Sequence, residues 1–398
     1  MRILLISDAI MNKDAGGISQ TLYNLFSFAP PPDILCITSK RELLKNPPSE
    51  PYQNRYLTYN FEVIYVKGNR FSKYINPFIN WFNYSFNQLF RNFKSLKRQI
   101  EAYNPDVIIS CPNGPVSVFM HNKLLKGLSV NKVIPYFMDD WMYQMEFKWV
   151  GGEIHQSIKQ LLSNNKAWLM ISEDLSKILV ERYHIKPESL LEVHNPVDIS
   201  NAPDVELLTA KKEFKLAYAG ALWPMHFDSF KLVAAAVNKL KATMQVNLVL
   251  YTSVNFWDWH KSVIEPLGVI YGGSIPYKDI HKKLSEADAL ILVSSFLQEY
   301  SSHSKGSLQT KITDYLKSKR LIISCGPSYS ANHNFLKKHD CGICIETNNV
   351  EEVALQLGNI LENIEDNQKK VQNGWNLLEA EFTFEKIHEK LENFISES

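Results

Sequence analysis

The chain opens on Met1-Arg2-Ile3-Leu4-Leu5-Ile6-Ser7-Asp8, a short run of aliphatic side chains that ends in a serine and an aspartate. The segment Asp14-Ala15-Gly16-Gly17-Ile18-Ser19-Gln20 follows, and the apolar periodicity from Leu22 to Phe28 then predicts a helix. An apolar run followed by a turn and a helix is typical of the first strand of a parallel sheet that is covered on both faces. The opening of the chain therefore favours an α/β fold.

The same alternation of short apolar runs and longer helical segments recurs along the whole chain. The strands expected in the first half are Ile3–Ile6, Ile34–Ile37, Glu62–Val66, Val107–Ser110, Val133–Met138, Trp168–Ile171 and Leu190–Val193. Those expected in the second half are Lys215–Tyr218, Val246–Tyr251, Val269–Tyr271, Ala289–Val293, Leu321–Ser324 and Gly342–Ile345. The Asn-Pro and Ala-Pro breakers of Asn195–Glu206 separate the two series. We predict two doubly wound, Rossmann-like domains that face each other across a cleft, with ligands at the carboxyl ends of the strands.

Composition sets limits on the class of protein. The chain has 398 residues, of which 45% are hydrophobic and 21% charged, as is typical of a globular protein of two or three domains. The net charge of +1 argues against a partner nucleic acid. No run of about 20 apolar residues and no signal peptide are visible, which predicts a cytoplasmic protein. The five cysteines include Cys341 and Cys344 at CxxC spacing, for which buried thiols are favoured over a redox or metal site.

One stretch combines a basic, a hydroxyl and an acidic side chain at helical spacing. It reads Leu308-Gln309-Thr310-Lys311-Ile312-Thr313-Asp314-Tyr315-Leu316-Lys317-Ser318-Lys319-Arg320 and precedes the strand Leu321–Ser324. A helix that begins near Thr310 would direct its N–H groups, this hydroxyl and the Lys311 charge at one anion. Asp314 lies one turn further on the same face, where a carboxylate could accept hydrogen bonds from ribose hydroxyls. The alternative is an ordinary amphipathic helix.

Glycines mark two further places where an anion could approach the backbone. Gly16 and Gly17 precede the first helix, and Gly220 ends the strand Lys215–Tyr218. Free N–H groups at such turns favour phosphate, although a simple turn explains either glycine as well.

The order of these motifs resembles that of a known family. It runs from Gly16-Gly17 through Asn104-Pro105-Asp106-Val107-Ile108-Ile109, Ile171-Ser172, Asn195-Pro196-Val197-Asp198, Tyr218-Ala219-Gly220 and Ala287-Asp288-Ala289 to Thr310-Lys311-Ile312-Thr313-Asp314-Tyr315-Leu316. This order is similar to that of retaining, nucleotide-sugar-dependent glycosyltransferases of family 4, which have the GT-B fold. The resemblance implies that residues 206–377 hold the donor and residues 1–195 the acceptor. It also implies that 378–398 form a helix that crosses back, and that no metal or other cofactor is required.

The resemblance assigns site residues unevenly. It places Gly16, Gly17, Gly220, Thr310 and Lys311 at the donor diphosphate or, for the first two, the acceptor, and Asp314 at the ribose. Members of the family often carry a histidine near the end of the strand that here reads Tyr136-Phe137-Met138-Asp139-Asp140-Trp141. Asp139 and Asp140 are therefore the catalytic candidates, the alternative being that they cap the next helix.

The loop after Gly220 departs from the family pattern. Family members usually supply an arginine and a lysine to the diphosphate there, whereas this chain offers His226 as the nearest cation and Lys231 beyond it. Because the leaving group's charge must be neutralised, this difference keeps a second hypothesis open. The chain is either a hexosyltransferase of retaining type that makes a surface polysaccharide or glycoconjugate, or a GT-B protein that binds nucleotide sugars or glycans, or scaffolds a partner, without turnover.

A basic and aromatic segment spans 67–98. No Asp or Glu occurs from Val63 to Ile100, and seven Lys or Arg side chains alternate there with Phe, Tyr and Trp. Such a segment can lie at a membrane interface, beside a lipid-linked acceptor, or it can cover a core with a solvated basic edge. Binding to nucleic acid is disfavoured by the near-neutral charge of the whole chain. Peripheral contact with the inner face of a membrane therefore remains one of two hypotheses for residues 67–98.

Overall fold

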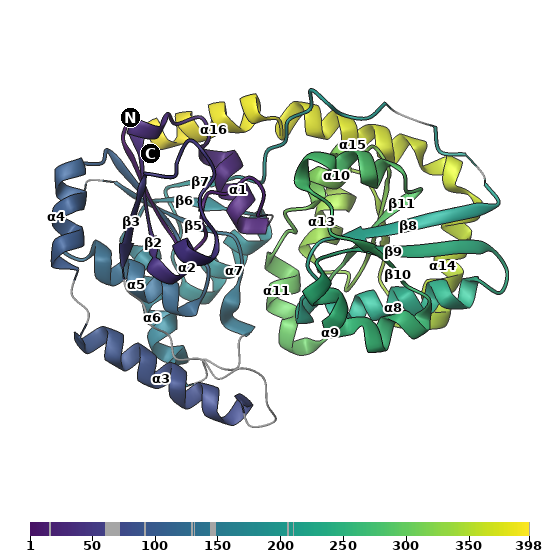
Figure 1. The fold of residues 1–398 in the computed structure, drawn as a ribbon, viewed down its shortest axis with the longest axis horizontal. Helices are drawn as coiled ribbons and strands as arrows, with labels where there is room; N and C mark the ends of the chain where they lie inside the picture. The colour runs from purple at the N-terminus through teal and green to yellow at the C-terminus, as the bar shows by residue number, and fades with distance from the viewer. Residues whose placement is uncertain are drawn as a thin grey trace. The chain divides into compact units, whose positions relative to one another are not determined.

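The computed structural model of the chain describes residues 1–397 except 16, 60–71, 91–92, 129, 131, 144–148, 205–206 and 210. It divides into two compact units (Figure 1). Unit 1 comprises Met1–His194 together with His388–Ser398, and unit 2 comprises Asn195–Ile387. Each unit is an α/β domain built on one parallel sheet, which confirms the predicted fold class.

Unit 1 contains a seven-stranded sheet in the order β3-β2-β1-β4-β5-β6-β7. Its strands are β1 (Ile3–Ser7), β2 (Ile34–Ser39), β3 (Tyr56–Tyr59), β4 (Val107–Cys111), β5 (Val133–Phe137), β6 (Ala167–Met170) and β7 (Ser189–Glu192). All neighbouring strands pair in parallel, and every residue of β1, β2 and β4 is buried. The strand expected at Glu62–Val66 falls on residues outside the description, and the observed edge strand β3 lies before it in the chain.

Helices cover both faces of this sheet, because each parallel crossover must return across it. They are α1 (Gly17–Phe26), α2 (Lys40–Lys45), α3 (Ser72–Phe90), α4 (Lys94–Tyr103), α5 (Pro115–Leu125), α6 (Gly151–Ser163) and α7 (Glu173–Tyr183). Figure 1 shows α3 at the margin of unit 1, set apart from the sheet.

Unit 2 repeats this plan with six strands in the order β10-β9-β8-β11-β12-β13. The strands are β8 (Glu213–Ala219), β9 (Gln245–Tyr251), β10 (Ile270–Gly273), β11 (Ala289–Val293), β12 (Leu321–Cys325) and β13 (Ile343–Ile345). The helices are α8 (Pro224–Leu240), α9 (Val254–Ile264), α10 (Tyr277–Ser285), α11 (Ser301–Gly306), α12 (Ile312–Lys317), α13 (Ala331–Lys338), α14 (Val350–Glu362) and α15 (Gln368–Glu381). Alternate strand residues feed two cores, since Leu216 and Tyr218 pack on one face and Ala217 and Ala219 on the other.

The last helix, α16 (Phe384–Glu397), passes from one unit to the other. Thr383, just before it, forms a β-bridge with Val197 inside unit 2. From His388 onward the helix belongs to unit 1, where Nε2 of His388 lies 2.7 Å from the carbonyl oxygen of Asn24.

The strand order reverses once in each sheet, between β1 and β4 in unit 1 and between β8 and β11 in unit 2. At such a point the loops that leave the two central strands diverge to opposite faces, and ligands of α/β sheets bind in the crevice that this opens. The topology therefore directs the search for a site to the residues that follow these four strands.

The structure also bears on membrane spans and on the two cysteines at CxxC spacing. Among the described helices, none is both long and apolar enough to cross a membrane. Cys341 is buried and Cys344 half-buried, both are free thiols, and no cluster of metal-ligating side chains is found in the part of the chain that the structure describes.

Candidate active site

In unit 2, Gly220 and Lys311 meet at the end of β8. Gly220 has a φ of +122°, which L side chains rarely adopt. A Cβ atom on this residue would lie 3.1 Å from Nζ of Lys311. The absence of a side chain at position 220 thus leaves the space that the lysine nitrogen occupies, and the two residues that the sequence predicted to hold a diphosphate are brought together.

The ammonium group of Lys311 is in an unusual setting. Its Nζ is buried without a hydrogen-bond partner and lies 3.8 Å from the centre of the Tyr218 ring, a cation–π distance. Burial lowers the pKa of Lys311 from 10.5 to about 7, and the carboxylate of Asp314 opposes this change. A lysine that is costly to charge and has no acceptor is a ready partner for an incoming anion.

Tyr315 attaches the helix that follows Lys311 to the sheet of unit 2. The helix α12 begins at Ile312, two residues after the start that the sequence predicted, and has six residues. The hydroxyl of Tyr315 accepts a hydrogen bond from the backbone N–H of Ala219 at 2.9 Å and donates one to the carbonyl of Ile291 at 3.3 Å. These bonds attach α12 to the two strands that flank the reversal point. Thr310 is half-buried just before the helix.

Two residues of the segment before α12 also have buried polar atoms, and one of them contacts the end of β11. Gln309 donates from Nε2 to the carbonyl of Val293 at 2.6 Å, whereas its Oε1 has no hydrogen-bond partner. The hydroxyl of Ser307 is likewise buried without a partner. Buried polar groups are normally satisfied, so these orphans indicate a place prepared for a polar ligand or water.

His226, in the first turn of α8, does not supply the cation that the sequence suggested. Burial, together with the neighbouring Lys311 and His303, lowers the pKa of His226 well below 6.5. The imidazole is therefore neutral near pH 7, and His226 can act only as a neutral hydrogen-bonding group. Lys231, the other basic residue after the glycine loop, is exposed on α8.

Asp314 is held by two side chains from α10. Its Oδ1 accepts a hydrogen bond from the hydroxyl of Tyr277 at 3.1 Å and lies 3.0 Å from Nε2 of His281. A carboxylate fixed through one oxygen can still accept hydrogen bonds at the other. The arrangement is compatible with the ribose role that the sequence predicted, which stays a prediction.

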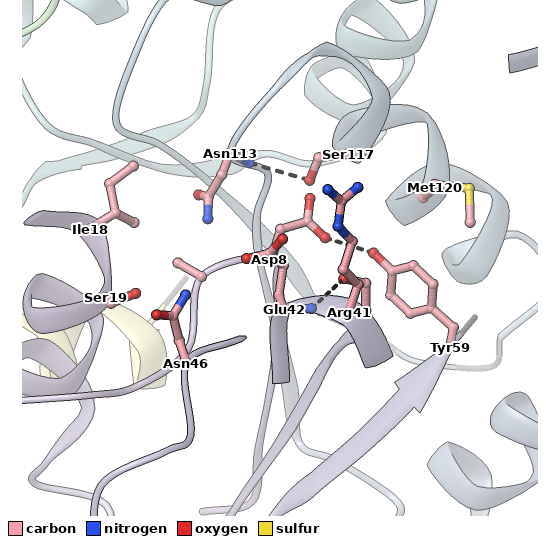
Figure 2. A pocket seen from close by; sticks show the side chains of 12 residues that line it. Asp8, Ile18, Ser19, Arg41, Glu42, Asn46, Tyr59, Asn113, Ser117 and Met120 are labelled. Atoms are coloured by element: carbon pink, nitrogen blue, oxygen red, sulfur yellow. Dashed lines mark hydrogen bonds between the residues drawn. The ribbon is translucent and has the colours of Figure 1, made fainter. Parts of the chain in front are cut away.

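Unit 1 has a pocket of about 400 Å³ at the reversal point of its own sheet (Figure 2). Asp8 follows β1, Ser39 ends β2, Tyr59 ends β3, and Asn113 follows β4. The remaining lining residues are Ala9, Ile18, Ser19, Arg41, Glu42, Asn46, Ser117 and Met120. Carboxylates, amides and hydroxyls in a pocket of this size suit a ligand with several hydroxyl groups.

Hydrogen bonds fix the polar side chains of this pocket. The hydroxyl of Tyr59 donates to Oδ1 of Asp8 at 2.7 Å, and Asn113 donates from Nδ2 to the hydroxyl of Ser7 at 3.2 Å (Figure 2 shows the Tyr59–Asp8 bond). Behind the pocket, burial lowers the pKa of His121 to about 4. The neutral His121 ring bridges two serine hydroxyls, those of Ser110 at 2.9 Å and Ser117 at 3.3 Å.

The two catalytic candidates, Asp139 and Asp140, have different surroundings in the structure. Asp139 follows β5, and its carboxylate, like that of Asp8, adds to the rise that burial causes in the pKa of the Cys111 thiol at the end of β4. It is not among the residues that line the pocket, and its catalytic role stays a prediction. Asp140 instead forms a buried ion pair, in which Nη1 and Nη2 of Arg182 donate to its two oxygens at 2.9 and 2.6 Å. We therefore correct the expectation for Asp140, because a carboxylate engaged on both oxygens serves the structure of unit 1.

The structure describes only one of the two glycines predicted to bind a ligand near the N-terminus. Gly16 lies outside the described residues. Gly17 begins α1 with a φ of +56°, and the next two residues, Ile18 and Ser19, line the pocket of unit 1. Gly17 thus lies beside the pocket of unit 1, and its donor role stays a prediction.

Comparison with known proteins supports the fold. No family model and no curated protein matches the chain. Solved structures do match: the Anabaena protein HepE in complex with UDP has a TM-score of 0.71 at 11% identity, with all of both chains covered. Sucrose-phosphate synthase from Thermosynechococcus elongatus has a TM-score of 0.70 at 12% identity, covering 100% of this chain and 98% of the other. A glycosyltransferase from Rickettsia africae has a TM-score of 0.66 at 16% identity, covering 100% and 99%. The chain therefore has the GT-B fold, as the sequence resemblance implied.

The pocket of unit 1 was not predicted from the sequence. The sequence did contain a signal for it, because the polar residues Ser7, Asp8 and Asn113 follow closely on two apolar runs. In a parallel sheet such residues gather at one edge. No local pattern connects Tyr59 to Asp8, however, because their contact joins two strands 51 positions apart.

Proposed function

We propose that the chain is a retaining glycosyltransferase that moves a sugar from a nucleoside diphosphate to a hydroxyl acceptor. The observation that carries this proposal is the lysine at the reversal point of unit 2. Lys311 is buried beside Gly220 without an acceptor of its own, at the sheet edge where α/β domains bind nucleotides. The fold neighbour HepE was solved with UDP and with UDP-glucose, which supports a nucleotide sugar as the donor here.

The donor roles follow from the groups present in unit 2. The Lys311 ammonium turns from the Tyr218 ring to the diphosphate and neutralises the charge that develops on the leaving group. Gly220 and Thr310 let the phosphates approach the backbone, Asp314 accepts the ribose hydroxyls, and His226 contributes a neutral hydrogen bond. This scheme requires no metal.

The acceptor role belongs to the pocket of unit 1. Asp8, Asn113 and the Tyr59 hydroxyl would receive the hydroxyl groups of a glycan or of another polyhydroxylated acceptor. Asp139, which follows β5 in the same unit, positions the reacting hydroxyl or accepts its proton. Gly17 leaves room for the acceptor or the donor.

The proposal includes the product, the compartment and the acceptor of the reaction. A hexosyltransferase of this kind would make a surface polysaccharide or glycoconjugate in the cytoplasm, with peripheral contact of residues 67–98 at the inner face of the membrane. The acceptor would then be a glycan, a lipid-linked glycan or a protein.

A thermal-shift and turnover screen tests the proposal. We expect one of UDP-, GDP-, ADP- or dTDP-sugars to raise the melting temperature, since a ligand at a hundred times its dissociation constant adds about 2.7 kcal/mol of stability. The same donor should release its nucleoside diphosphate when acceptors are supplied, and NMR of the product should give the donor's anomeric configuration. Absence of both a shift and turnover with every donor would overturn the proposal.

One observation favours a second candidate function. The loop after Gly220 has no pair of basic residues, and His226 is neutral. Of the candidate donor residues named above, Lys311 then supplies the positive charge for the diphosphate. A protein that binds the donor without transferring the sugar would show the thermal shift and no turnover. Lys311→Ala should weaken donor affinity strongly in either case, as calorimetry can measure.

A further inference from the structure

The carboxylate of Asp228 in unit 2 has one engaged and one unengaged oxygen. Asp228 lies in the first half of α8, the helix that follows β8. Its Oδ2 accepts a hydrogen bond from the backbone N–H of Phe296 at 2.9 Å. Its Oδ1 is buried and has no hydrogen-bond partner among the residues that the structure describes. Because an ionised carboxylate can only accept hydrogen bonds, Oδ1 requires a donor from outside this set of residues.

Gln309 presents a second acceptor of the same kind. Its Nε2 donates to the carbonyl of Val293, the last residue of β11, at 2.6 Å. This bond fixes the orientation of the amide, since a flipped amide would place its oxygen against the carbonyl oxygen. Oε1 is then the free end of the amide, and it is buried without a partner in the described part of the chain.

Both acceptors are attached to the loop that follows β11. Phe296 comes three residues after Val293, so the length of the chain keeps the N–H of one and the carbonyl of the other within about 10 Å. The hydroxyl of Ser229 donates to the carbonyl of Ser294 at 2.7 Å and holds α8 against the same loop. The two unengaged oxygens therefore belong to the reversal point between β8 and β11.

The same acceptors are close in the chain to the groups assigned to the diphosphate. Gln309 precedes Lys311 by two residues, and Asp228 follows His226 by two residues. The charge of Lys311 reaches His226, since it helps to lower the pKa of that imidazole. In a nucleotide sugar the sugar is bonded directly to the second phosphate, so a diphosphate at Lys311 places the sugar ring within one ring's width of this lysine. Two acceptors without donors are complementary to a ring that carries hydroxyl groups.

We propose that Oδ1 of Asp228 and Oε1 of Gln309 accept hydrogen bonds from hydroxyl groups of the transferred sugar. They thereby select a donor whose sugar has free hydroxyls on the edge that faces them. The inference rests on the proposed function, because it takes the diphosphate to bind at Lys311. A donor that lacks one of these hydroxyls leaves a buried oxygen unsatisfied, and sites of this kind discriminate strongly. Ordered water is the competing occupant, and it would satisfy both oxygens whatever the sugar.

Calorimetry on the full chain with paired ligands tests the role of Asp228. The pairs are UDP with UDP-glucose, GDP with GDP-mannose, ADP with ADP-glucose and dTDP with dTDP-glucose. Asp228→Asn keeps the size of the side chain and an oxygen for the N–H of Phe296, but it replaces the other oxygen by an NH₂ group. We expect the dissociation constant of the nucleotide sugar to rise about tenfold or more, and that of the nucleoside diphosphate to change less than about twofold. Lys311→Ala should weaken both members of the pair alike.

Donors that lack single hydroxyls identify the contact itself. Among the monodeoxy analogues of the bound nucleotide sugar, at least one should bind the wild type about tenfold more weakly than the parent donor does. The same analogue should bind Asp228→Asn as well as the parent does, because the variant has already lost the interaction. Asp258→Asn is the matched control, since Asp258 is exposed on α9 and pairs there with Lys261 at 2.8 Å. This control should bind both ligands as the wild type does.

The outcomes separate this inference from the proposed function. If Asp228→Asn binds the nucleotide sugar as tightly as the wild type, or if every deoxy analogue binds the wild type like the parent, the inference is wrong while the donor proposal stands. An equal loss of affinity for both members of the pair, with a lower melting temperature, would show that Asp228 only supports the fold, and it too would overturn the inference. Failure of the wild type to bind any of the eight ligands would overturn both.

Discussion

The affinity for the donor should fall as the pH rises above 7, because Lys311 binds it as a cation. In the free protein the pKa of Lys311 is about 7, since the nitrogen is buried away from water. A diphosphate beside Nζ favours the charged form and raises this pKa toward its ordinary value. Binding therefore takes up a proton wherever the pH lies between the free and the bound pKa.

The size of the effect follows from the free pKa. About half of the molecules hold a charged Lys311 at pH 7, about a tenth at pH 8 and about a hundredth at pH 9. The dissociation constant should then rise roughly fivefold from pH 7 to 8 and roughly tenfold from pH 8 to 9. At pH 8, binding should take up about 0.9 proton per donor molecule.

Isothermal titration calorimetry in two buffers of different ionisation enthalpy measures this uptake. A nucleotide sugar is the better ligand, because its diphosphate is fully ionised over this range and does not itself titrate. Lys311→Arg, charged at every pH, should bind without the pH dependence. A wild-type affinity that stays constant from pH 7 to 9, with no proton uptake, would refute the reasoning.

The same lysine should lower the stability of unit 2. Between pH 7 and about 10.5, the folded protein holds fewer protons at Lys311 than the unfolded chain, so the free energy of unfolding rises with pH. Lys311→Met removes this cost of up to about 4 kcal/mol at pH 7. The variant should therefore melt at higher temperature and bind no donor. A variant that is less stable than the wild type at pH 7 would contradict the account.

Three further substitutions give separable outcomes. Asp140→Asn leaves the Arg182 guanidinium without its negatively charged partner. The variant should destabilise unit 1 by about 3 kcal/mol in urea melts, with donor affinity unchanged. Gly220→Ala adds a Cβ atom 3.1 Å from the buried ammonium at a φ of +122°, and should cost at least about 1 kcal/mol and weaken donor binding. Tyr59→Phe removes the 2.7 Å bond to Asp8 and should raise the KM for acceptor several-fold while the KM for donor stays the same.

Much of the fold could be predicted because its strands are local in sequence. Each buried parallel strand is a continuous apolar run, so runs such as Ile3–Ile6 and Ala289–Val293 can be recognised as strands from the sequence. The edge strand Tyr56–Tyr59 was missed, since only one of its four residues is buried and its pattern is weak. The amphipathic pattern of α3 was visible, but which face it buries depends on tertiary packing.

The site was less predictable, because its properties arise from contacts between distant residues. The sequence indicated Gly220 and Lys311 but not their contact, which joins a strand end to a helix start 91 positions away. The neutral state of His226 depends on burial, and the engagement of Asp140 depends on an arginine 42 residues further along the chain. Local spacing carries none of this information.

The most direct test is a crystal structure of the full chain with a nucleotide sugar bound. The account predicts the diphosphate within hydrogen-bond distance of Lys311 Nζ, next to Gly220, with a ribose hydroxyl on Asp314. Electron density for the nucleotide elsewhere, with Lys311 still folded against Tyr218, would contradict it.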